Sequence, residues 1–329
     1  MAKLLKLMQN EWMKLWNKKG TWVMIGIMLL LTGAMMGVMK FIDTQQSTFT
    51  EVENNPSAEV SNAPSWKGPM NDELAYLEMQ LADDTLSKAE RKELEADAKV
   101  LEYRLDNDIE PVDSFSKEGM LMDPSGIGGT VLLLTVIVAA GIVASEFSQG
   151  TIKMLLTRPV KRWKILTSKF LTVNLFGMFL MVIGYIFYIL LAMILFKSGT
   201  GQELSWNGKE VVEVSVWAKS LYMLLLSFGS VFVIATFAFT IGSVFRSSSL
   251  AIGLSLFIYF SGAMVTALLA RYEIAKYLLF THMDLTQFET GVKLIEDVTM
   301  PFSLAVLAVY MIVFLVISYS TFVKRDVTA

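Results

Sequence analysis

Cysteine is absent from this chain of 329 residues, and histidine occurs once, as His282. A disulfide, a thiolate metal site and a cysteine nucleophile are therefore excluded. A zinc site built from several histidines is excluded for the same reason, and we expect His282 to be an ordinary surface residue of a loop. These absences predict a chain with no catalytic residue, no metal site and no cofactor of its own.

Charged residues are also scarce, at 18% of the chain against about 25% in ordinary globular domains. Hydrophobic residues make up 54%, and the mean hydropathy is +0.51. The apolar excess is concentrated in long runs, which favours an integral membrane protein over a large soluble core. The net charge of −3 gives no indication of a nucleic-acid partner.

Six intervals of the chain contain no Asp, Glu, Lys, Arg or His over at least 20 residues. A helix needs about 20 apolar residues to cross the roughly 30 Å hydrocarbon core of a bilayer. We therefore predict an all-α integral membrane protein with six transmembrane helices. The predicted helices built on these intervals are 20–41, 124–145, 170–196, 220–245, 247–270 and 298–323.

Lysine and arginine next to the predicted spans predict the orientation of the chain. Fourteen of them lie on the side of the N-terminus, and six lie in the short loops of the other side. The excess marks the cytoplasmic side, so both termini, the tail 324–329 and the loop 146–169 are expected inside a cell membrane. Absent cysteine with abundant lysine and methionine points to a Gram-positive bacterium.

The long segment 42–123 and the loops 197–219 and 271–297 are then expected outside. The last of these is too short and too polar to span, but its apolar stretch can dip partly into the outer leaflet. Within the long segment, helical spacing of leucines predicts a helical hairpin at 71–108. Its second arm opens at Ser87 with Glu90 three residues later, a capping box.

Residues 1–19 have the pattern of an amphipathic helix. Trp12 and Trp16 fall on its apolar face beside several leucines, and lysines fall on the opposite face. A basic helix with tryptophans on its apolar side is typical of a helix lying in the membrane interface. The N-terminal region is therefore expected to contact membrane lipid, unless its lysines act only as an orientation signal.

The strongest local pattern is the basic segment 146–169 between the second and third predicted spans. Gly150 followed by Thr151 can turn the chain and cap a new helix. Pro159 disfavours helical geometry at Arg158 and can begin a second helix. We expect a rigid elbow suited to docking on another protein. The alternative is a basic loop that serves only to orient the chain.

At this elbow the sequence resembles the ABC-2 type permease family, the membrane subunits of type V ABC exporters. The similar pattern is Glu-x-x-x-Gly-Thr-Ile-Lys from Glu146, then Leu-x-x-Arg-Pro-Val-x-Arg and a final lysine. The tryptophan-bearing N-terminal helix with Glu11 is similar to the family's connecting helix. The resemblance implies that the elbow and this helix carry the coupling to an ATPase. The residues so implied are Glu146, Gly150, Thr151, Arg158, Pro159 and Arg162, with Glu11, Trp12 and Trp16 on the interfacial helix.

The resemblance also implies partners, because no Gly-x-x-x-x-Gly-Lys-Ser/Thr phosphate loop occurs in this chain. ATP and Mg²⁺ would be bound by a separate ATP-binding cassette subunit, and a second permease chain, identical or different, would be needed to enclose a pathway. The expected function is therefore a permease subunit of an ATP-driven exporter, without enzyme activity of its own.

Other classes of function stay open. An ion-coupled secondary transporter is disfavoured because the six spans lack the ionisable residues that such proteins place in the membrane. A membrane-embedded enzyme would need positioned acid–base groups that the spans do not contain. A ligand-sensing subunit using the outer hairpin is compatible with the sequence. The transported substrate can be a peptide, an antibiotic, a lipid, a polymer or an ion.

Overall fold

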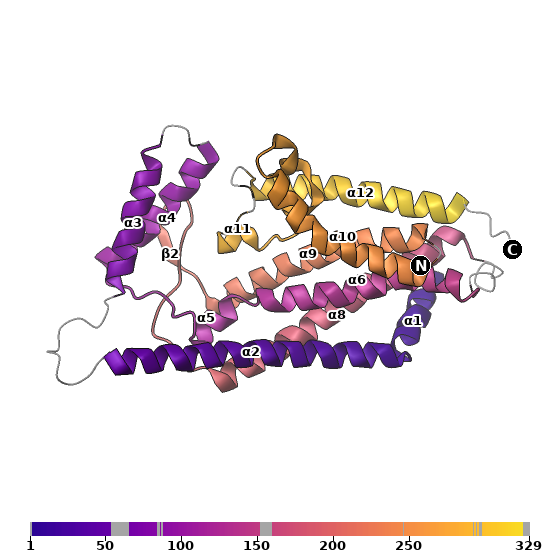
Figure 1. Ribbon diagram of the computed structural model, residues 1–329, viewed down its shortest axis with the longest axis horizontal. Coiled ribbons are helices and arrows are strands. Elements are labelled where there is room, and N and C mark those ends of the chain that lie inside the picture. The colour runs from indigo at the N-terminus through magenta and orange to yellow at the C-terminus, as the bar shows by residue number, and fades with distance from the viewer. Residues whose placement is uncertain are drawn as a thin grey trace. The chain divides into compact units, whose positions relative to one another are not determined.

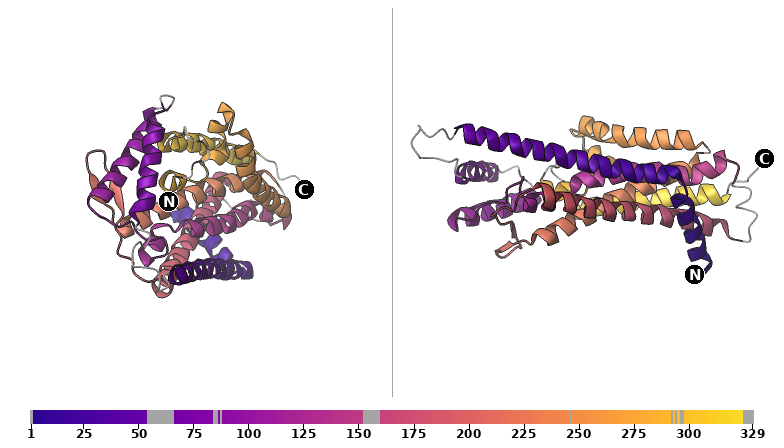
Figure 2. Two further views of the ribbon diagram at one scale, coloured as in Figure 1. Left: turned by 60° about the vertical axis from the view of Figure 1, so that its left-hand side comes forward. Right: turned by 90° about the horizontal axis from the view of Figure 1, so that it is seen from below.

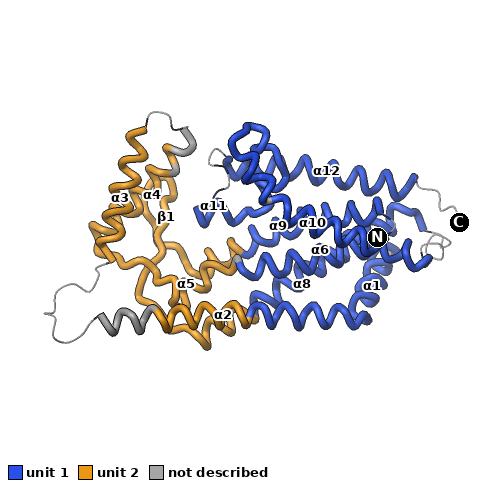
Figure 3. The backbone as a smooth tube through the Cα atoms, viewed as in Figure 1, with its two compact units in different colours: residues 1–32, 125–186, 224–329 blue, residues 33–124, 187–223 orange. Residues whose placement is uncertain are grey.

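The computed structural model describes residues 2–53, 66–83, 86, 88–151, 160–245, 247–291, 293, 295 and 298–324. The chain forms two compact units (Figure 3). Unit 1 consists of residues 1–32, 125–186 and 224–329, and unit 2 consists of residues 33–124 and 187–223.

Among the described residues, six helices are long and apolar enough to cross a membrane. This confirms a helical protein with six potential spans (Figure 1). The helices are α2 (Lys19–Glu53), α6 (Ser125–Ser148), α8 (Arg162–Leu195), α9 (Val216–Val244), α10 (Ser248–Leu269) and α12 (Met300–Lys324).

The helix ends differ from the predicted spans where charged residues continue a helix beyond the apolar run. α2 runs on to Glu53, although the charge-free interval ends at residue 39 and the predicted span ends at residue 41. α8 begins at Arg162, inside the segment predicted to be the elbow, and not at Pro159. A charge-free interval marks only the part of a helix that can contact lipid. The full length of the helix is set by backbone hydrogen bonds and local packing.

In unit 1, α6 and α9 form the centre of the helical packing. About two-thirds (67%) of the most apolar window of each is buried, against 11% in α12. The two helices approach closely at Gly242, where a Cβ atom would stand 2.2 Å from the carbonyl oxygen of Ala140. The apolar side chains of α10 and α12 are largely exposed, as expected for helices that contact lipid or a partner.

The short helix α1 (Ala2–Trp16) turns away from the first part of α2 at a steep angle (Figure 2). The hydroxyl of Thr21 donates to the carbonyl of Leu15 at 2.5 Å and closes this turn. Trp12 and Trp16 pack edge-on against Phe179 of α8, with ring centroids 5.8 and 5.0 Å apart. The tryptophans therefore attach α1 to the bundle, a role beyond the lipid contact predicted for them.

Between α10 and α12 the chain forms two 3₁₀ turns, η1 (Glu273–Tyr277) and η2 (Leu279–His282), followed by α11 (Gln287–Thr290). The prediction of a surface histidine is wrong, because His282 is fully buried. One ring nitrogen, Nδ1, lies 2.7 Å from the Ser303 hydroxyl, and Nε2 lies 2.8 Å from the carbonyl oxygen of Lys276. Since a carbonyl only accepts, Nε2 carries the proton and Nδ1 accepts from Ser303.

Unit 2 contains the helical pair α3 (Lys67–Leu81) and α4 (Lys88–Asp106), which lie side by side (Figure 1). They occupy the region where a hairpin was predicted, although α3 begins before residue 71. Ser87, the predicted cap of the second arm, lies outside the described residues. A short helix, α5 (Lys117–Met122), follows, capped by the Ser116 hydroxyl, which accepts from the backbone N–H of Gly119.

Unit 2 also holds an antiparallel pair of short strands, β1 (Leu204–Trp206) and β2 (Val211–Glu213), which a purely helical prediction missed. The side-chain oxygen of Asn207 accepts from the backbone N–H groups of Lys209 and Glu210 and so forms the turn. Gly208 in this turn has φ +93°, a conformation that favours glycine. Strands of three residues are too short to show a period-two pattern, so periodicity could not have revealed them.

Candidate functional site

Four charged side chains meet at one end of unit 1, where α1, the end of α6 and the start of α8 come together. They are Glu11 and Lys14 of α1, Glu146 of α6 and Lys169 of α8. We call these four residues the charged cluster. Two of them, Glu11 and Glu146, were predicted from the sequence to be functional, and the structure brings these two together.

Lys169 is the most deeply buried member of the cluster, with a side chain only 1% exposed. Its ammonium group lies 2.7 Å from a carboxylate oxygen of Glu11 and 3.0 Å from one of Glu146. It also donates to the carbonyl oxygen of Ile142 at 3.3 Å. Three acceptors thus match the three protons of the ammonium group, which is the condition under which a buried charge is tolerated.

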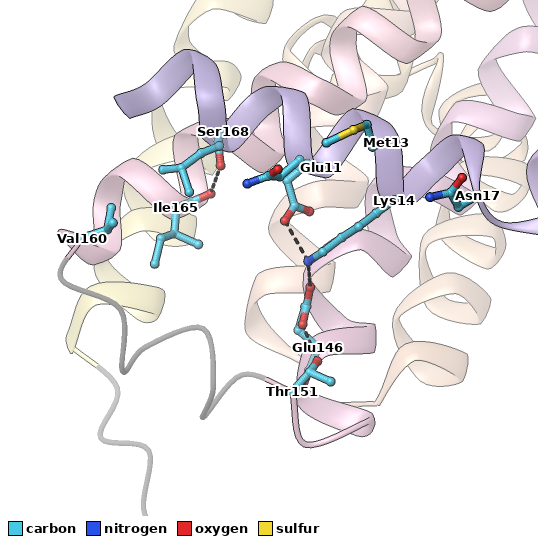
Figure 4. Close-up of a pocket in the computed structure, with 11 residues that line it drawn as sticks. Glu11, Met13, Lys14, Asn17, Glu146, Thr151, Val160, Ile165 and Ser168 are labelled. Carbon is cyan, nitrogen blue, oxygen red and sulfur yellow. Dashed lines mark hydrogen bonds and ion pairs between the residues drawn. The ribbon is translucent and has the colours of Figure 1, made fainter. Parts of the chain in front are cut away.

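Lys14 joins the same two carboxylates from the solvent side (Figure 4). Its ammonium group lies 3.1 Å from Glu11 and 3.1 Å from Glu146. Partial burial disfavours the charged form, but the two carboxylates outweigh it and hold the pKa of Lys14 above its usual value. The cluster therefore contains two positive and two negative groups and is neutral as a whole.

The start of the predicted elbow supports the cluster. The Thr151 hydroxyl turns back and donates to the Glu146 carboxylate and, at 3.4 Å, to the Glu146 carbonyl. Gly150 makes this reversal with φ +70°, and no described atom lies within 4 Å of the position of a Cβ there. A side chain at Gly150 is therefore disfavoured by the left-handed backbone and not by lack of space.

Arg162, another predicted coupling residue, makes a different contact. The Arg162 guanidinium donates to the carbonyl oxygen of Val323 at 3.2 Å, so it connects the start of α8 to the end of α12. Arg162 therefore does not join the charged cluster. Arg158 and Pro159 lie outside the described residues.

An open pocket of about 480 Å³ lies beside the charged cluster. Figure 4 shows the side chains of α1 on one wall and those from the ends of the elbow on the other. The walls combine amide and charged groups with apolar side chains. The lining residues are Leu7, Asn10, Glu11, Met13, Lys14, Asn17, Glu146, Thr151, Val160, Ile165 and Ser168. Such a mixed surface suits a polypeptide that offers both apolar and hydrogen-bonding groups.

Comparison with known proteins places the chain in a family. A family model described as "Protein of unknown function (DUF2705)" matches residues 115–328. The chain belongs to the DUF2705 family. The matched region includes Glu146, Lys169 and the intervening elbow, whereas Glu11 and Lys14 of α1 precede it.

Two proteins of Bacillus subtilis (strain 168) are similar to this chain. The chain is similar to "Uncharacterized protein YhcI", with 38% identity over 98% of this chain and 99% of the relative, so that similarity includes α1. It is also similar to "Uncharacterized membrane protein YdbK", with 32% identity over 59% of this chain and 76% of the relative. The chain is thus a multi-pass membrane protein with relatives in a Gram-positive bacterium.

Sequence reasoning did not single out Lys14 and Lys169 as members of a site. Lys169 was noted only as the final lysine of the elbow pattern, and Lys14 only as one of several basic residues of the N-terminal helix. The signal that could have found Lys169 is its position directly before a charge-free run. A lysine there either extends to the interface or needs a buried carboxylate partner.

Proposed function

We propose that this chain is the permease subunit of an ATP-driven exporter and receives the movement of a separate ATPase chain at the charged cluster. The observation that carries the proposal is the set of ion pairs made by Lys169 to Glu11 and Glu146. These pairs tie α1 to the adjoining ends of two potential spans, at the segment whose sequence resembles the coupling elbow of ABC-2 permeases.

The charged cluster supports force transmission because separating its members costs free energy. Breaking a buried ion pair by removing one partner costs about 3–5 kcal/mol, and Lys169 would leave two carboxylates behind. α1, the end of α6 and the start of α8 are therefore expected to move together. A push on α1 or on the elbow would reach two spans at once.

The pocket beside the cluster supports the docking of a partner. One wall comes from α1 and another from residues of the elbow, Thr151 and Val160 among them. A helix or loop of an ATPase chain that enters this pocket would contact α1 and both ends of the elbow. Because this chain has no phosphate-binding loop, ATP and Mg²⁺ would be bound by that partner, and a second permease chain would complete the pathway.

The proposal is tested by purifying the tagged chain from its native membrane and measuring ATP hydrolysis retained with the tag. The wild type should retain a separate chain with a phosphate-binding loop and ATPase activity, and Lys169→Ala should lose most of both. Lys161→Ala, which removes an exposed lysine nearby, should retain both. Transport by this chain alone, driven by a proton or sodium gradient, would contradict the proposal.

A further inference from the structure

Asp284 lies between η2 and α11. Along the membrane normal, it is level with the middle of α9. The backbone N–H of the next residue, Leu285, donates to the Ser230 hydroxyl at 3.1 Å. Ser230 is the middle residue of α9, and a Cβ at Gly229 would stand 3.0 Å from the Leu285 side chain. A helix of 29 residues is about 43 Å long and exceeds the hydrocarbon thickness. Its middle therefore lies within the membrane.

The contacts of this segment with α10 independently place Asp284 at a similar depth in the membrane. The ring of Phe280 lies against Gly262, where a Cβ would meet it at 2.0 Å, so the segment follows α10 inward from its end. Tyr259, in the middle of α10, lies about one helical turn further in than Gly262. The contacts of η1 and η2 with α10 agree with this placement. The membrane interior therefore holds an acidic group, although the charge-free intervals of the spans contain none.

The carboxylate of Asp284 is exposed although the residues on either side of it are buried. One of its oxygens accepts from the backbone N–H of Thr286 at 2.9 Å and from the Thr286 hydroxyl at 2.6 Å. These bonds fix its orientation. Within the described part of the chain, no lysine, arginine or histidine forms an ion pair with it. The result is an oriented, exposed anion at mid-depth.

Such an anion is not compatible with a lipid-facing surface, because ionisable groups within the membrane face a water-filled cavity or an opposite charge. The charge-free intervals of a second copy of this chain hold no lysine or arginine. A cation that pairs with Asp284 would therefore most simply come from a molecule in the pathway. Phe260, exposed on α10 next to Tyr259, offers apolar surface for the rest of that molecule.

We propose that Asp284 lines the export pathway and binds the cationic group, an ammonium or a guanidinium, of an amphipathic cargo. The inference rests on the proposed function, because it takes the chain to enclose a pathway. It names the chemical class of the cargo, which the sequence leaves open. Asp284 acts as a binding residue, and Thr286 positions its carboxylate.

The absence of cysteine makes a direct test available. In membrane vesicles, Tyr259→Cys would be labelled with a cationic methanethiosulfonate (trimethylammonium-ethyl) and an anionic one (sulfonato-ethyl). With Asp284 present the cationic reagent should react faster. Adding Asp284→Asn, which keeps the oxygen that accepts from Thr286, should lower the ratio of the two rates about tenfold. Phe260→Cys repeats the measurement at an exposed position if Tyr259→Cys does not insert.

Two controls define the background. Tyr272→Cys, exposed near the start of η1, should react with both reagents at a ratio that Asp284→Asn leaves unchanged. Val309→Cys, exposed in the middle of α12, should react with neither.

An unchanged rate ratio, or no reaction at either α10 position, would overturn the proposal. A disulfide between Asp284→Cys in one copy and Lys293→Cys in another, formed while both α10 positions stay unreactive, would also overturn it. That result would assign Asp284 to an interface between copies. Labelling needs neither ATP nor an ATPase chain, so this outcome is independent of the test of the proposed function.

Discussion

At the scale of single residues, Lys169 is the centre of the charged cluster. Its ammonium group serves two carboxylates and a backbone carbonyl from a position that is 1% exposed. Lys169→Ala should lower the stability of the purified protein by about 3–5 kcal/mol, because Glu11 and Glu146 would lose their buried counter-charge. Thermal unfolding in detergent, followed by the fluorescence of the seven tryptophans, measures this loss.

Lys161→Ala is the matched control, since it removes the same kind of side chain from an exposed position shortly before Lys169 in the sequence. It should change stability by no more than about 0.5 kcal/mol. Equal unfolding temperatures for both variants would mean that the charged cluster contributes nothing measurable.

The buried His282 predicts a dependence of stability on pH. Burial lowers its pKa, although its hydrogen bond to the Lys276 carbonyl partly offsets this. Below about pH 6.5 the unfolded chain binds a proton that the folded chain resists. Stability should therefore fall as the pH falls from 7 to 5, by at most about 1.4 kcal/mol per pH unit from this residue.

The variant His282→Gln isolates this contribution, because glutamine can hydrogen-bond but does not titrate in this range. Its unfolding temperature should change less between pH 7 and pH 5 than that of the wild type. Parallel curves for the two proteins would show that His282 is already protonated or is not buried.

What the sequence could predict at this scale was the identity of the acidic members of the site. Glu146 and Glu11 stood out by pattern and by resemblance, as did Thr151, whose hydroxyl donates to Glu146. Their basic partners did not, because Lys169 lies 158 positions from Glu11 and Lys14 lies 132 positions from Glu146. Contacts at such separation leave no trace in local periodicity, and only the packing of α1 against α6 and α8 creates them.

At the scale of elements, the turn that ends α6 carries a specific backbone requirement. Gly150 has φ +70°, where a side chain costs roughly 1–2 kcal/mol. Gly150→Ala should therefore destabilise the protein by about that amount and weaken the hydrogen bonds from Thr151 to Glu146. The loss is measured by thermal unfolding, as for Lys169.

The control is Gly129→Ala in the same helix, where the position of the Cβ is open. There alanine should be neutral or stabilising by up to about 1 kcal/mol, since it favours the helix. If the two alanine variants behave alike, the left-handed turn at Gly150 is not required.

The elements themselves were predictable where apolar runs are long and not where they are short. All six long helices follow from intervals free of charge. The strands β1 and β2 flank the Asn207–Gly208 turn; the Asn-Gly dipeptide indicates a turn, but strands of three residues carry no pattern of their own. The burial of His282 depends on contacts of η1 and η2 with α10 and α12, and a polar loop sequence does not reveal such packing.

At the scale of the whole molecule, the distribution of lysine and arginine predicts that both termini are cytoplasmic. A chain without cysteine allows single cysteines to report this. Asn107→Cys, at an exposed position after α4, should react with an impermeant thiol reagent applied to intact cells. Lys161→Cys should react only after lysis. The opposite pattern would reverse the orientation and remove the elbow from the side on which ATP is found.

The central claim is that a separate ATPase chain docks in the pocket between α1 and the elbow, and site-specific photocrosslinking tests it most directly. A photoreactive benzoylphenylalanine would replace Asn17, which lines the pocket and is exposed, and Tyr76 of α3 as a control. If the ATPase chain docks there, Asn17→benzoylphenylalanine should crosslink in native membranes to a chain with a phosphate-binding loop, and the control should not. A crosslink from Asn17 only to lipid or to a second copy of this chain would contradict the account.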